Sequence, residues 1–177
     1  MKKCIFLLFL LFACKENKPS EASFKLKAGG LLLIEGSFND SLPANIWRYY
    51  DSDKNLLVKK AYYPPDKTGK VLSDIFFYDS KRLVYFKNRF GKTESPESKN
   101  WGETLVKEYC QGCHTNQEEM NGPALYEMRN LSQENFSRKI TQFHPSNSNQ
   151  AINYNFLTLE DLKQIKRFID NELVKSE

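Results

Sequence analysis

Short apolar runs separated by turn residues fill the first half of the chain. Breaker-rich segments such as 39–43 and 64–69 divide apolar stretches at 31–38, 46–50, 56–63, 71–78 and 83–86. Short strands at even spacing, with turn residues between them, indicate an antiparallel meander. We therefore expect residues 24–90 to form an antiparallel β domain.

The pattern changes to helical periodicity beyond residue 100. Residues 91–100 are polar and rich in turn formers, which is the composition of a linker. Behind a capping Ser132, apolar residues recur at i, i+4 and i+7, as Phe136, Ile140 and Phe143. A capping-box pattern at Thr158 opens an amphipathic terminal helix. These patterns predict an α+β protein of two domains, with an all-α domain over 101–177.

The first residues have the pattern of an export signal. Two Lys precede nine apolar or small residues, 5–13, whereas a membrane-spanning helix needs about 20 apolar residues. Cys14 follows directly and begins a polar tether, 14–23. A small residue, a Cys and a polar tether resemble the lipobox of bacterial lipoproteins, which implies removal of a signal peptide, 1–13, and a lipid on Cys14. An ordinary signal peptide cut nearby, with Cys14 left free, is the alternative.

Composition narrows the classes of function. The chain has 177 residues, of which 27% are charged, 40% hydrophobic and 14% aromatic, so it belongs with globular proteins rather than disordered or multi-span membrane chains. The net charge of +4 comes without a basic cluster, which argues against a nucleic-acid partner. With only four Cys and two His, the placement of these residues matters most.

The most informative motif is C-x-x-C-H at Cys110, Cys113 and His114. For this composition, chance produces the motif with a probability of about one in a thousand. Two thiols one helical turn apart can add to the two vinyl groups of one haem, and the His after the second Cys can bind the iron from the same side. The motif therefore predicts covalently bound haem c.

Other chemistries of a C-x-x-C pair fit the context less well. A thioredoxin-like site would need a βαβ setting, and a structural zinc site would need a fourth ligand, for which His144 or an acid is available. A disulfide between Cys110 and Cys113 stays open in an exported protein.

From about residue 100 onward the chain resembles a class I c-type cytochrome. The family's first-helix pattern is matched from Gly102 to Cys110, and the family's Gly-Pro-x-Leu loop is matched at residues 122–125. The resemblance implies an all-α cytochrome c domain over 101–177 with one covalent haem on Cys110 and Cys113. It further implies that His114 is an axial iron ligand and that the Pro123 carbonyl accepts the imidazole N–H.

The second axial ligand departs from the family pattern. The loop that usually supplies a Met, here 144–156, contains none, and His144 is the strong iron ligand left in it. His144 is therefore the candidate second axial ligand. An open or water-bound iron and ligation by Met128 are the alternatives.

Residues from about 30 to 90 resemble MORN-type β-hairpin repeats. The resemblance rests on the segment 36–40, on the segment 47–51 and on Asn55 and Leu56. It implies a sheet of hairpins, whose aromatic residues we interpret as cross-strand pairs. No catalytic residue is evident in this half of the chain.

Together these patterns predict a lipid-anchored, extracytoplasmic monohaem cytochrome facing the periplasm or the cell exterior. We expect it to carry electrons to a redox partner protein and not to act as an enzyme. A haem protein whose open iron binds a gas or reduces peroxide is one alternative. A partner-binding module with an accessory haem domain is another.

Overall fold

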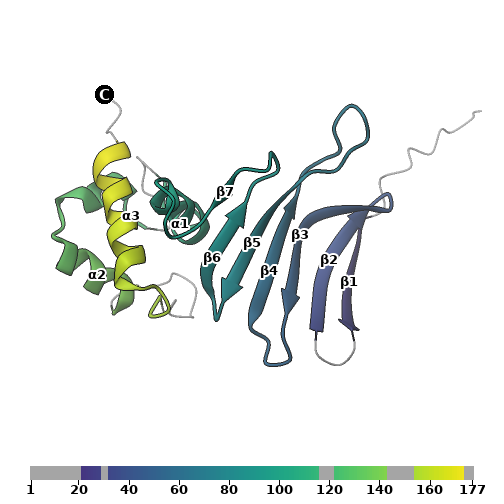
Figure 1. Cartoon of the computed structure of the whole chain (residues 1–177), viewed down its shortest axis with the longest axis horizontal. Coiled ribbons are helices and arrows are strands. Elements are labelled where there is room, and N and C mark those ends of the chain that lie inside the picture. Colours follow the sequence, from purple (N-terminus) through teal and green to yellow (C-terminus); the bar gives the residue numbers. More distant parts are fainter. Residues whose placement is uncertain (1–20, 29–31, 116–121, 143–153, 174–177) are drawn as a thin grey trace, which may run out of the picture.

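The structure is a computed structural model that describes residues 21–28, 32–115, 122–142 and 154–173. Seven antiparallel strands form one sheet in chain order: β1 (Glu21–Ala28), β2 (Leu32–Asn39), β3 (Leu42–Tyr50), β4 (Leu56–Tyr62), β5 (Ser73–Asp79), β6 (Arg82–Lys87) and β7 (Thr93–Glu94). The helical elements are α1 (Trp101–Tyr109), the 3-10 helix η1 (Leu125–Asn130), α2 (Gln133–Thr141) and α3 (Leu159–Glu172). The helices lie together at the β6–β7 end of the sheet (Figure 1).

Turn chemistry explains the meander. The β2–β3 turn has a positive φ at both Asp40 and Ser41, and the β5–β6 turn has one at both Ser80 and Lys81. Two-residue turns with this geometry match the right-handed twist of the strands that they join. The predicted antiparallel meander is therefore confirmed, with β1 and β7 added at its two edges.

The expected fold class is wrong in its second half. The seven-stranded antiparallel sheet is the largest structural unit of the described chain, the helices are few and short, and no all-α cytochrome c domain is evident in this part of the chain. Tyr78 and Leu83, from β5 and β6, belong to the same buried cluster as Trp101, Leu105 and Ile165 from the helices. Short amphipathic helices cannot bury all of their apolar faces against one another, so the sheet covers one side of the helical core.

A polar anchor joins the same two layers. The Arg82 guanidinium of β6 donates to both carboxylate oxygens of Asp161 in α3, at 2.6 and 3.0 Å. Asp161 is 1% exposed, and it also completes the predicted capping box with Thr158. Burial opposes the charge of Asp161, but the hydrogen bonds from Arg82 and Thr158 outweigh it and lower the pKa of Asp161. The anchor is therefore an ionised carboxylate at neutral pH.

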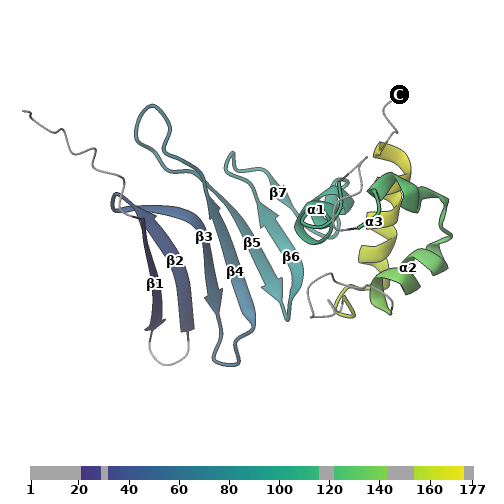
Figure 2. The same ribbon diagram turned by 180° about the vertical axis from the view of Figure 1, so that it is seen from behind.

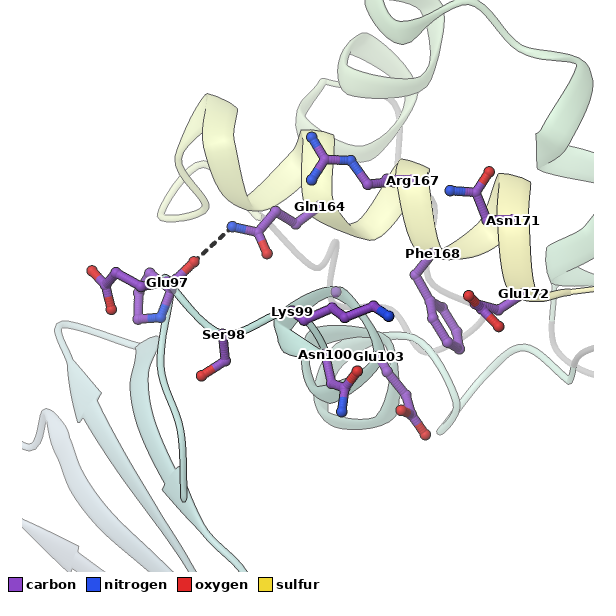
Figure 3. A pocket seen from close by; sticks show the side chains of 12 residues that line it. Glu97, Ser98, Lys99, Asn100, Glu103, Gln164, Arg167, Phe168, Asn171 and Glu172 are labelled. Carbon is purple, nitrogen blue, oxygen red and sulfur yellow. Dashed lines mark hydrogen bonds between the residues drawn. The ribbon is translucent and has the colours of Figure 1, made fainter. Parts of the chain in front are cut away.

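The segment 91–100, expected to be a linker, takes part in the fold. It contains β7, which pairs with β6 by placing Glu94 opposite Phe86. The Pro96 carbonyl accepts a hydrogen bond from Gln164 of α3 at 2.7 Å (Figure 3). This polar segment therefore extends the sheet by one strand through its backbone, and it also bonds to α3 through the Pro96 carbonyl. Among the described helices, none is long and apolar enough to span a membrane.

Candidate functional site

The C-x-x-C-H motif begins where α1 ends. Cys110 caps the helix by donating its N–H to the Val106 carbonyl at 2.9 Å. The N–H groups of Cys113 and His114 then both donate to the Cys110 carbonyl, at 3.1 and 3.0 Å. One tight turn therefore brings the three residues of the motif together.

The imidazole of His114 is held by the loop that the sequence singled out. His114 is 6% exposed, and its Nδ1 lies 2.7 Å from the carbonyl oxygen of Pro123. A carbonyl can only accept, so Nδ1 carries a proton, and in a neutral imidazole the lone pair is then on Nε2. This is the tautomer that ligates a metal through Nε2. The contact is the one that the cytochrome resemblance implied for Pro123.

Two glycines allow close contacts near the site, one against the His114 ring and one between α1 and α3. A Cβ added to Gly122 would lie 2.2 Å from Cε1 and 2.6 Å from Nδ1 of His114. A Cβ added to Gly102 would lie 2.1 Å from the Gln164 carbonyl oxygen, so α1 and α3 cross with their backbones nearly in contact. Gly122 thus leaves room for the imidazole, and Gly102 leaves room for the helix crossing.

Cys110 and His114 line a small, closely packed apolar cavity. Its walls come from α1, η1, α2, α3 and the segment before α3: Tyr109, Cys110, His114, Leu125, Met128, Phe136, Ile140, Tyr154, Leu157, Ile165 and Ile169. Burial, with a contribution from neighbouring Cys113, raises the pKa of the Cys110 thiol to about 12. Cys110 is therefore a neutral thiol at physiological pH in the chain as described.

The chemistry of the donor set fits haem. Within the described residues, no group of three His, Cys, Asp or Glu side chains could hold a metal ion. The Cys110 thiol and the His114 imidazole line a wall of apolar and aromatic side chains, and Cys113 lies in the same turn of the backbone. A flat, largely apolar macrocycle needs such a wall, because its hydrophobic surface must be kept from water.

Two predicted site residues lie outside the described part of the chain. They are Cys14, the proposed lipid site, and His144, the candidate second axial ligand. Met128, the alternative ligand, is 5% exposed and lies in the cavity wall.

Sequence reasoning missed Tyr109 and left the role of Tyr154 open. Both line the cavity, and the Tyr154 hydroxyl donates to the Tyr109 carbonyl at 2.9 Å. Their rings also meet edge to face, with centroids 6.2 Å apart. The only signal in the sequence was the position of Tyr109 directly before Cys110.

A second groove lies on the outer side of the crossing between α1 and α3. It is lined by the segment 96–100 together with residues of both helices, and its charges are of both signs (Figure 3). Its lining includes the acidic residues Glu97, Glu103 and Glu172 and the basic residues Lys99 and Arg167. Among the described residues, no thiol or imidazole lines this groove.

We predict that Gly122→Ala destabilises the chain by about 1–3 kcal/mol, since the added methyl must displace the His114 ring or the loop backbone. Gly112→Ala is the matched control within the same motif, because a Cβ there meets nothing within 4 Å. We expect it to change the free energy of unfolding by less than about 0.5 kcal/mol. Urea unfolding of both variants measures the difference, and equal values would contradict the close packing of Gly122 on His114.

Comparison with known proteins found no match to this chain, neither among protein-family models nor among curated proteins or solved structures. The interpretation of the site therefore rests on its own residues: two thiols and an imidazole that share one turn at the edge of an apolar cavity.

Proposed function

We propose that the chain binds one haem c covalently through Cys110 and Cys113, with His114 as an axial iron ligand, and that it transfers electrons to a partner protein. The observation that carries this proposal is the contact between His114 Nδ1 and the Pro123 carbonyl, beside Cys110 and the apolar cavity. That contact selects the tautomer needed for ligation through Nε2 and fixes the orientation of the ring.

Each residue of the site has a part in holding the group. Cys110 and Cys113 supply the thiols for two thioether bonds, and one turn presents both of them. Apolar side chains such as Leu125, Phe136 and Ile169 form the wall that excludes water. When bound, haem supplies a one-electron couple between ferric and ferrous iron.

The composition of the wall favours electron transfer. Apart from His114 and Cys110, the polar groups that the described wall contains are the hydroxyls of Tyr109 and Tyr154, and both donate to backbone carbonyls. Burial raises the pKa of each phenol, that of Tyr154 to about 12, so both remain neutral. A wall whose described residues include no carboxylate and no amine suits a group that gains and loses an electron without moving protons.

We further propose that the protein is exported and held on a bacterial membrane by a lipid on Cys14. The support comes from the sequence alone: a short apolar run that ends in a small residue and Cys14, followed by a polar tether. Several acyl chains on one residue bind a membrane firmly, whereas a single chain binds weakly and reversibly.

Covalent haem is tested on denaturing gels stained for haem peroxidase activity. The boiled wild type should keep its colour, and Cys110→Ala/Cys113→Ala should lose it, because no thioether can then form. Gly112→Ala keeps both thiols and His114, so it should stain like the wild type. Loss of colour from the boiled wild type, or colour in the double variant, would contradict the proposal. Rapid binding of carbon monoxide by the reduced wild type would favour a gas-binding role over electron transfer.

Anchoring is tested by fractionation of cells that export the protein. Cys14→Ser should move the haem protein from the membrane fraction to the soluble exported fraction, since Ser cannot carry the thioether-linked lipid. Ser20→Ala, a change of similar size in the same tether, should leave it in the membrane fraction. If Cys14→Ser stays with the membranes, Cys14 is not the anchor.

A further inference from the structure

The last turn of α1, immediately before the haem-attachment motif, is fixed to the sheet by an ion pair. The Glu108 carboxylate pairs with Lys59 of β4 and accepts a hydrogen bond from the Tyr78 hydroxyl of β5 at 2.6 Å. The side chains of Lys59 and Glu108 are only 16% and 14% exposed. Two opposite charges are therefore held together, largely shielded from water, two residues before Cys110.

Aromatic side chains surround the pair of Lys59 and Glu108. The Lys59 ammonium lies 4.1 Å from the centroid of the Phe76 ring, within the range of a cation–π contact. Burial, reinforced by the Glu108 carboxylate, raises the pKa of Tyr78 far above its usual range, so Tyr78 remains a neutral donor. Arg48 is the further charged group that acts on Tyr78. At this end of α1, Lys59 compensates the charge of the Glu108 carboxylate.

The next residue forms a second attachment. The Tyr109 hydroxyl donates to the Lys81 carbonyl at 2.9 Å and accepts the Leu83 N–H at 2.6 Å, while its ring lines the cavity. Leu83 is fully buried, so its N–H depends on this phenol. Glu108 and Tyr109 together connect β4, β5 and β6 to Cys110.

We propose that Lys59, Glu108 and Tyr109 are positioning residues for the haem, through which the sheet orients the attachment turn and sets the charge beside it. This inference rests on the proposed function. Lys59 cancels the negative charge of Glu108, which would otherwise stabilise ferric over ferrous iron. The meander thereby acts on the reduction potential of a haem that it does not itself bind.

The sign of the charge separates this role from simple stabilisation. Oxidation adds one positive charge to the iron, so a net negative charge nearby favours the ferric form and lowers the midpoint potential. A net positive charge raises it. The effect is larger for charges shielded from water than for exposed ones, which salt and solvent screen.

The experiment measures the midpoint potential of the haem-loaded full chain by spectroelectrochemistry. Lys59→Met leaves Glu108 uncompensated and should lower the potential, whereas Glu108→Gln leaves Lys59 uncompensated and should raise it. The double variant should return close to the wild-type value. Lys60→Met, one residue along β4 and therefore on the opposite face of the sheet, is the matched control for Lys59. Glu103→Gln, from the exposed pair with Lys107, is the control for Glu108. Both controls should shift the potential much less.

Each outcome decides between the proposals. Shifts of the same sign in both single variants would mean that the pair only stabilises the fold, and would overturn this inference while leaving the proposed function in place. Unchanged midpoint potentials in both single variants would likewise overturn this inference and leave the proposed function in place. If Lys59→Met does not accumulate, Glu108→Gln alone decides, because an unchanged or lowered potential in that variant contradicts the inference. A wild type without covalent haem would overturn both proposals.

Discussion

The packing of α1 between the β6–β7 end of the sheet and α3 determines where the attachment motif lies (Figures 1 and 2). Trp101, Leu105 and Val106 of this helix are fully buried. The residues of α1 share a buried cluster with Tyr78 and Leu83 of the sheet. At Gly102, α1 also crosses α3. The helix therefore fixes where Cys110 leaves its last turn, and with it the position of the whole attachment motif.

The polar contacts of this junction are few and well shielded. Arg82 with Asp161, Lys59 with Glu108, and the Tyr109 hydroxyl each bridge the sheet and the helices. Removing one partner of a buried pair leaves the other charge uncompensated, at a cost of about 3–5 kcal/mol. Such contacts hold the helices in one orientation against the sheet, which apolar packing alone specifies less strictly.

The individual strands, turns and helices could be predicted from the sequence, but which of them pack against one another could not. Alternating apolar residues and paired turn residues identified the meander, and the spacing of Cys110, Cys113 and His114 placed them on one turn. Periodicity shows that an element has an apolar face but not which element covers it, so Tyr78 and Leu83 gave no sign that they face α1. Glu94 looked like part of a polar linker because backbone pairing with Phe86 leaves no mark on composition. Tyr109 reaches the β5–β6 turn through its hydroxyl, a contact that no short motif encodes.

The central claim is that the attachment turn and the sheet form one cooperative unit, and native-state hydrogen exchange across a urea series tests it most directly. The Leu83 N–H, bonded to Tyr109, reports on the sheet, and the Cys110 N–H, bonded to Val106, reports on the attachment turn. If the claim is correct, both amides open with the same free energy and the same dependence on urea, as members of one unfolding unit do. A Cys110 amide that opens at much lower free energy while Leu83 stays protected would contradict the claim, because the turn would then unfold independently of the sheet.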